Sequence, residues 1–261
     1  MKTAPRWYQL CLGKTGWLVV AGCLGLVAAA HAQKPQPEPS KTPLPDSPQP
    51  QTANGSETFV GYLTTRSLFF PAIASSPYSL SVGEKFKLFV DESISPPIFI
   101  VAGISAGFGQ ARNSPQEYGQ GANGYFSRFG SSVGRGASND FFGTFILASV
   151  LHQDPRYFPH SHPTLWSSIR YAAVRVVVTR KNNGANTFNS SGLVGILAGE
   201  TLANTWLPRS QQTGGDTAKR FGSDMGWQFA GNVFKEYWPT LFKNLGLKKL
   251  HVIADPNNPT P

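Results

Sequence analysis

The segment "LASVLHQDPRYFPHSHP", Leu147 to Pro163, holds three of the chain's five histidines beside an acidic residue. His160 and His162 alternate along a proline-bounded stretch, and alternate residues of an extended chain lie on one side. Together with His152 or Asp154 they would offer the nitrogen and oxygen ligands that transition metals accept. One interpretation of this spacing is therefore a metal site.

Two further acids enlarge the chemistry that this segment would support. Glu200 or Asp224 would complete the metal ligand set. Without a metal, Asp154 would orient His152 for acid-base catalysis, and Glu200 would be a further catalytic candidate. These residues make a metal-assisted hydrolase the alternative function, with a transition metal as its cofactor.

A purely structural interpretation of the same segment is favoured. His152 would lie in the last turn of a helix, where a cation meets the free carbonyl groups favourably. Pro155 ends that helix and restricts Asp154 to an extended conformation. The histidine pair also lacks the fixed helical spacing of a zinc protease motif. We therefore expect a junction between two helices and no cofactor.

Glu200 lies in the otherwise apolar run "GLVGILAGETLANTW", with Asn204 one turn later. A carboxylate buried there would need a cationic partner. Arg170, Arg175 or Arg180 of the preceding segment would supply it, and a structural ion pair is favoured over a catalytic role.

The first thirty-two residues have the composition of a secretory signal peptide. Basic residues at positions 2, 6 and 14 precede an apolar stretch from Trp17 to Ala30. We expect cleavage after Ala32, with retention as an uncleaved anchor as one alternative. A second alternative treats "VAGC" as a lipoprotein box, which would leave a lipid anchor on Cys23. Both cysteines of the chain, Cys11 and Cys23, lie within this segment, so the mature chain would have no thiol.

The charge balance indicates the class of partner. Without the signal, 20 basic side chains face 14 acidic ones. Such an excess favours anionic envelope surfaces, or another envelope protein, as partners. No interleaved basic and aromatic motif indicates nucleic acid. The expected location is the periplasm or outer membrane of a bacterium, and the sequence leaves the oligomeric state open.

The remaining chain divides by composition into a linker, one domain and a tail. Residues 33–56 are rich in proline, which predicts an extended, disordered tether. Residues 57–244 predict a mainly α, single-domain helical bundle, and residues 245–261 a C-terminal tail. The helical patterns cover 81–95, 98–109, 125–136, 138–152, 163–180, 191–206 and 217–238, where Pro239 ends the last helix. The β-branched end of the 163–180 segment also suits a strand.

Glycines four residues apart recur within these predicted helices. The pairs are Gly103 with Gly107, Gly130 with Gly134, Gly195 with Gly199, and Gly222 with Gly226. Glycine costs about 1 kcal/mol at a helical position, and close approach of two helix backbones would offset that cost. The spacing predicts closely packed helices.

The apolar runs are shorter than the ~20 residues of a membrane span. A soluble or peripheral bundle is therefore favoured over one inserted in lipid. An outer-membrane β-barrel is a further alternative, although the sequence lacks sustained alternation.

The stretches "FFGTFILASVLHQDPRYF", "VTRKNNGANTFNSSGLVGILAG" and "FAGNVFKEYWP", between Phe141 and Pro239, resemble an uncharacterised family of exported bacterial envelope proteins. The resemblance implies an envelope location and assigns no activity. With the signal, the linker and the glycine-bearing helices, it favours a structural or interaction module at or near a membrane. A periplasmic binding module is a third alternative, and it would require a deep apolar cavity.

Overall fold

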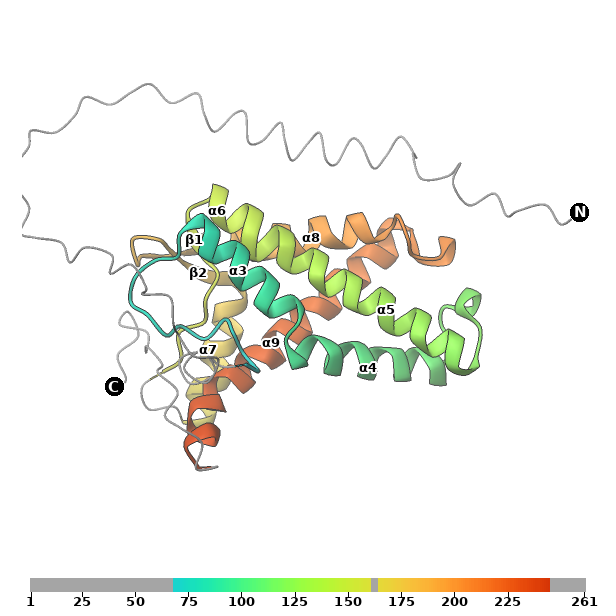
Figure 1. The fold of residues 1–261 in the computed structure, drawn as a ribbon, viewed down its shortest axis with the longest axis horizontal. Helices are drawn as coiled ribbons and strands as arrows, with labels where there is room; N and C mark the ends of the chain where they lie inside the picture. The colour runs from blue at the N-terminus through green and yellow to red at the C-terminus, as the bar shows by residue number, and fades with distance from the viewer. Residues whose placement is uncertain (1–67, 161–163, 245–261) are drawn as a thin grey trace, which may run out of the picture.

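The structure, a computed structural model, describes residues 68–160 and 164–244. These residues form a helical bundle with one small sheet, which confirms the predicted mainly α, single-domain class (Figure 1). The helices are α3 (Val82–Ser93), α4 (Pro96–Ala111), α5 (Gly121–Asp140), α6 (Ala148–Val150), α7 (Leu165–Val177), α8 (Ser190–Ala203) and α9 (Gly214–Asn244). Shorter elements are η1 (Gln116–Tyr118), the π-helix η2 (Phe141–Leu147), η3 (Arg209–Gln211), β1 (Gln153–Asp154), β2 (Val178–Lys181) and β3 (Asn186–Phe188). The predicted signal peptide, the linker and the C-terminal tail lie outside the described residues.

Helix α3 begins with the capping box that its sequence predicts. The Ser81 hydroxyl accepts from the Glu84 backbone N–H at 3.3 Å, and the Glu84 carboxylate accepts from the Ser81 N–H at 2.8 Å. Each contact gives an acceptor to a backbone N–H at the start of the helix, where no preceding turn supplies one. Pro96 and Pro97 then start α4, at positions where the missing proline N–H costs nothing.

Residues 121–150 form one continuous rod through α5, η2 and α6, where two separate helices were expected. The predicted caps Ser138 and Asn139 have other partners. The Ser138 hydroxyl donates to the Gly134 carbonyl, and the Asn139 amide donates to Asp224 on α9. Neither side chain caps the start of a new helix, and the helical backbone continues without a break.

The rod is the central element of one layer. Helix α4 packs on α5 from one side, while α8 packs on α5 and η2 (Figure 1). Helix α7 packs against α9. The far end of the rod is held by Lys85 of α3, whose buried ammonium donates to the Ala148 carbonyl at 2.9 Å and to Asn182 at 3.2 Å.

One boundary confirms an alternative that the sequence left open, and another contradicts the prediction. The "VRVVVT" segment is divided: α7 ends at Val177 and the antiparallel β1-β2-β3 sheet begins at Val178. Helix α9 continues through Pro239 to Asn244, so the prediction that this proline ends the helix is wrong. A proline removes one backbone hydrogen bond, and the rest of a long helix is able to compensate for that loss.

One of the four glycine pairs makes the predicted close contact. A Cβ atom at Gly195 would lie 2.5 Å from the backbone nitrogen of Gly143, and one at Gly199 would lie 2.7 Å from that of Asn139. Both contacts join α8 to the central rod. In contrast, Gly222 and Gly226 face open space, so the prediction of close packing at that pair is wrong.

In each of the other two pairs, one glycine has a close neighbour and the other has none. Gly103 faces the Tyr125 hydroxyl and Gly134 faces the Trp206 ring, at ordinary contact distances. Gly107 and Gly130 have nothing nearby. Among the four pairs, close approach to another helix backbone therefore occurs at the α8 pair and not as a repeated motif.

The distribution of apolar and charged side chains is unusual for a bundle. Nearly half of the buried apolar residues are alanines, and charged residues such as Lys85, Glu200 and Glu236 are among the largest fully buried side chains. Large apolar side chains are instead exposed on α3, α4, α7 and α8. The interior therefore contains several charged side chains, which are rarely fully buried unless they are paired.

Candidate functional site

A cavity of about 340 Å³ opens among the helices. Residues from α3, α4, α5, η2, α8 and α9 contribute to its wall. Polar side chains in the wall include Glu92, Arg135, Asn139, Asp140, Thr144, Arg156, Arg175, Asp224, Gln228, Asn232 and Lys235. A cavity of this size with convergent polar groups is the usual form of a small-molecule site. Its lining is more polar than the deep apolar cavity that the binding-module alternative requires.

Arg135 of α5 is the central cation beside this cavity. Its Nε donates to Glu200 of α8 at 2.7 Å, and its Nη2 donates to both carboxylate oxygens of Asp224 on α9, at 3.1 and 3.2 Å. One guanidinium therefore joins three helices. The fixed fork of donors on arginine suits this arrangement.

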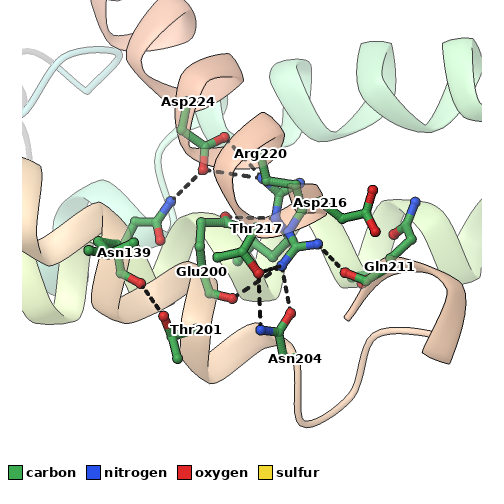
Figure 2. A network of polar contacts seen from close by, with 12 residues as sticks. Asn139, Glu200, Thr201, Asn204, Gln211, Asp216, Thr217, Arg220 and Asp224 are labelled. Carbon is green, nitrogen blue, oxygen red and sulfur yellow. Dashed lines mark hydrogen bonds and ion pairs between the residues drawn. The ribbon is translucent and has the colours of Figure 1, made fainter. Parts of the chain in front are cut away.

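Arg220 of α9 completes the pairing of Glu200 (Figure 2). Its Nε donates to the second Glu200 oxygen at 2.6 Å, and its Nη2 donates to Asn204 at 2.6 Å. Its Nη1 donates to the Gln211 carbonyl and so holds the loop before α9. Glu200 is fully buried, and a buried carboxylate requires such complete pairing.

The predicted partners of Glu200 were wrong, although the predicted ion pair is present. We expected the cation to be Arg170, Arg175 or Arg180. Glu200 instead pairs with Arg135 and Arg220. The physical reason is that α8 packs on α5 and α9 through the Glu200 side. Arg175 instead donates to Asn186 at 3.3 Å.

The two carboxyl groups on Arg135 have opposite pKa shifts. Burial raises the pKa of Asp224 to about 7, against the attraction of Arg135, and its hydrogen bond with Glu200 adds to the rise. For Glu200, burial favours the neutral form, but hydrogen bonds from Asp224, Arg135 and Arg220 outweigh it and lower its pKa. Near neutral pH the pair therefore shares one proton, held on Asp224.

This arrangement predicts that the protein loses stability as pH rises from about 4 to about 7. The folded state retains the Asp224 proton up to about pH 7, whereas the unfolded chain releases it near 3.8. Above that lower value, folding must retain a proton that the unfolded chain no longer binds, so the free energy of unfolding falls. The Asp224→Asn variant should reduce this decline by about 2 kcal/mol.

Urea denaturation of both proteins at about pH 5 and about pH 7.5 measures this difference. Glu200 acts in the opposite sense, because its lowered pKa gives stability that is lost only as pH falls below its unfolded value. An equal decline in the variant and the natural protein would contradict the assignment of the proton to Asp224.

A second pair of carboxyl groups, Glu92 and Asp140, lines the same cavity. Glu92 of α3 accepts a hydrogen bond from Thr144 at 2.9 Å. Burial raises the pKa of Glu92 against the attraction of Lys235. Burial also raises the pKa of Asp140, and repulsion from Glu92 and Asp224 adds to that rise. Both side chains lie within the protein and keep part of their surface accessible.

The histidine-bearing segment makes a different set of contacts. Asp154 pairs with Arg156 at 2.6 Å, and both side chains are buried. Arg156 also donates to the carbonyls of Ser76 and Tyr78 and so holds the segment before α3. As predicted from Pro155, Asp154 is extended and lies in β1. These contacts fit the structural interpretation of the segment.

Glu236 of α9, absent from the sequence prediction, receives the rest of this segment. The His160 ring nitrogen Nδ1 lies 2.5 Å from a Glu236 oxygen, and the Tyr157 hydroxyl donates to the other oxygen at 2.8 Å. The His160 backbone N–H donates to the same carboxylate at 2.9 Å. Burial and the neighbouring Glu236 raise the pKa of Tyr157 far above its usual range, so the phenol stays a donor.

The proposed metal ligands have separate partners in the structure. His152 is exposed in a left-handed turn, with a φ of 53° and not in the helix as expected. Glu200 and Asp224 bind arginines, whereas His160 binds Glu236. His162 lies outside the described residues. Among residues 68–160 and 164–244, no group of three histidine, cysteine or acidic side chains is arranged to hold a metal. The hydrolase alternative stays a prediction.

Sequence reasoning missed most of the cavity residues. In the sequence, the polar residues of these helices resemble those of an ordinary solvent-exposed helix face. The residues missed in this way are Glu92, Arg135, Asp140 and Lys235. One signal was present: Asp140 directly precedes the uncharged run from Phe141 to Leu151, where an acid is close to buried positions.

Comparison with known proteins gives no relative: no family, no curated protein and no solved structure matches the chain.

Proposed function

We propose that the protein is an exported envelope protein that acts as an interaction module at a membrane, with the exposed face of α4 resting on lipid. The observation that carries this proposal is that no exposed residue of α4 has a polar side chain. These residues are Phe99, Ile100, Ile104, Gly107, Phe108 and Ala111. A helix on the surface of a water-soluble protein normally turns charged and polar residues outward.

Exposed apolar side chains also lie directly before α4 and on the neighbouring α5. Phe108 is 61% exposed, and Phe126 at the start of the neighbouring α5 is 67% exposed. Ile94, directly before α4, is also exposed at 67%. Exposed apolar side chains gathered on and next to one helix are typical of helices that lie in the interfacial region of a bilayer.

Charge supports the same location. Arg112 follows the last residue of α4 and is exposed, which places a guanidinium at the edge of the apolar face. A cation there would meet lipid phosphate groups, and the basic balance of the mature chain acts in the same direction.

Within residues 68–160 and 164–244, no single helix has the length and apolarity needed to cross a membrane. Helices α3 and α4 reach both only as a pair, which is bent by 43°.

Flotation of the purified protein with vesicles of phosphatidylglycerol and phosphatidylcholine tests the proposal. We expect the natural protein to float with the vesicles in high salt, because apolar contact is not screened. Ile104→Lys should reduce the vesicle-bound fraction about tenfold, since it places a charge against the acyl chains.

Two matched variants add the same charge elsewhere. Leu197→Lys changes the exposed apolar face of α8, on the other side of α5, and Ser127→Lys changes an exposed polar position of α5. Both should float as well as the natural protein. A natural protein that stays in the dense fraction, or three lysine variants with equal losses, would refute the role of α4.

A further inference from the structure

Arg128 and Arg156 show how this protein satisfies a buried guanidinium group. Both residues are almost fully buried. Arg128 donates to four neutral oxygen atoms, three of which are backbone carbonyls. Arg156 donates to the Asp154 carboxylate and to two backbone carbonyls. These acceptors use most of the five N–H donors that a guanidinium carries.

Arg175 of α7 is buried to a similar extent, with 7% of its surface exposed, but it has far fewer acceptors. Its Nη1 donates to the Asn186 amide oxygen at 3.3 Å, and its guanidinium lies 5.8 Å from the centre of the Tyr171 ring. Among the described residues it has no other hydrogen bond and no ion pair. Most of its N–H donors therefore lack an acceptor there, and a buried cation in this state is costly.

The last turn of α7 favours a cation but gives Arg175 no acceptor. Arg175 lies in that turn, where the negative end of the helix dipole stabilises a positive charge. The carbonyls of Val176 and Val177 accept from Asn189, at 2.9 and 2.8 Å. These contacts also place the start of α8 against the end of α7. The helix end therefore explains why the charge is tolerated, but not what its remaining donors bind.

The first turn of α8 adds positive potential at the same place. The cavity is lined by Arg175 together with Asn189, Ser191 and Gly192. Helix α8 has 14 residues and no acidic residue in its first turn, so no carboxylate of that turn balances its positive end. The N–H groups of Ser191 and Gly192 donate to neutral side-chain oxygens, those of Gln153 and Asn189. The helix end therefore contributes its field to the cavity, and Arg175 contributes the hydrogen-bond donors.

We infer that the cavity binds a small organic monocarboxylate, with the carboxylate group on Arg175 beside the start of α8. The planar fork of a guanidinium matches the two oxygen atoms of a carboxylate, which would supply both the missing acceptors and the missing anion. Val178 and Ile196 also line the cavity and would contact a short alkyl group. A volume of about 340 Å³ is at the lower end for small-molecule sites, which suits a ligand of a few carbon atoms.

The acids of the cavity wall restrict the charge of this ligand. Glu92 and Asp140 line the same cavity, and the cation that attracts both of them is Lys235. A dianion such as hydrogen phosphate would meet twice the repulsion from these acids that a monoanion meets. A single carboxylate is therefore favoured over a phosphate group.

Isothermal titration calorimetry of the purified protein with sodium butyrate tests the inference, in Tris-chloride buffer near neutral pH. We expect saturable binding of butyrate. n-Butylammonium, which has the same alkyl chain and the opposite charge, should bind at least about tenfold more weakly, and so should inorganic phosphate.

Arg175→Gln removes the guanidinium, and the affinity for butyrate should fall about tenfold or more. The change should not lower the midpoint of urea denaturation without ligand, because the lost charge has no anionic partner among the described residues. Arg170→Gln is the matched control, since Arg170 is an exposed arginine of the same helix. It should bind butyrate as the natural protein does.

Asn186→Asp tests the same site while Arg175 stays in place. Asn186 is exposed, so the variant should fold, and its new carboxylate would give Arg175 an anion from within the protein. The midpoint of urea denaturation should rise, and the affinity for butyrate should fall about tenfold because the two carboxylates compete for one guanidinium. Asn183→Asp, at an exposed position of the same hairpin turn, adds an equal charge and should leave butyrate binding unchanged.

Three results would overturn the inference: no saturable binding of butyrate, binding of butylammonium or phosphate as tight as that of butyrate, or an unchanged butyrate affinity in Asn186→Asp or in a folded Arg175→Gln variant. The titration contains no lipid, so its outcome does not depend on the flotation result.

Discussion

Replacing Gly199 with alanine should destabilise the protein by about 2 kcal/mol, although alanine is the better helix former by about 1 kcal/mol. The new Cβ atom would lie 2.7 Å from the backbone nitrogen of Asn139 and 2.9 Å from its Cα. These are backbone atoms of the central rod, which cannot rotate away as a side chain does. Helix α8 would have to move outward, and the Arg135 contacts of Glu200, one residue later, would move with it.

Gly226→Ala on α9 is the matched control for this prediction. Gly226 belongs to a glycine pair with the same spacing, but its added Cβ atom would meet nothing within 4 Å. The control should therefore stabilise the protein by about 0.5 to 1 kcal/mol through helix propensity. Urea denaturation measures both changes. If the two variants shift stability in the same direction, then α8 and the rod are not in close backbone contact.

Glu200→Gln should cost about 3 kcal/mol of stability, the largest loss that we expect from a single change of one atom in a side chain. The amide retains the size of the carboxyl group but leaves Arg135 and Arg220 without their shared anion, and both guanidinium groups are largely buried. The variant also replaces one of the two carboxylate oxygens, each of which accepts a hydrogen bond from an arginine, with an amide NH₂ group. Two donors would then face each other without an acceptor.

The control for this change is Lys219→Ala, which removes an ion pair at the surface. Lys219 is 82% exposed and lies 3.5 Å from Asp216. Exposed pairs of this kind contribute about 0 to 1 kcal/mol, so denaturation of this variant should hardly differ from that of the natural protein. Losses of equal size at positions 200 and 219 would mean that the buried network contributes no more than a surface pair.

The local features of the fold could be predicted from the sequence because they depend on neighbouring residues. The capping box of Ser81 and Glu84 needs only a spacing of three, and Pro155 alone makes Asp154 extended. The interpretation of the histidine segment as a helix junction rested on the same kind of local rule. The structure agrees with it through the contacts of Asp154 and Arg156.

Features that depend on distant partners could not be predicted in this way. Asn139 has a side chain suited to capping, but its amide instead donates to Asp224, far away in sequence, and the helix continues. The choice between Arg135 and Arg175 as the partner of Glu200 depends on which helix α8 packs against. No spacing within α8 contains that information.

The cavity shows the same limit more clearly. Glu92, Asp140 and Lys235 come from three different helices, and no spacing along the sequence indicates that they meet. That they line one cavity becomes visible only when the helices are assembled.

The wide turn of η2 has a consequence for the evolution of this protein. A π-helical turn accommodates more residues per turn than an α-helix, and each residue added to or removed from an α-helix rotates everything beyond it by about 100°. Asp140 at one end of η2 faces the cavity, while Ala148 at the other end receives the Lys85 ammonium. Descendants that lose a single codon between these positions would turn one end away from its neighbours, so we expect this interval to keep its length wherever the gene has diverged.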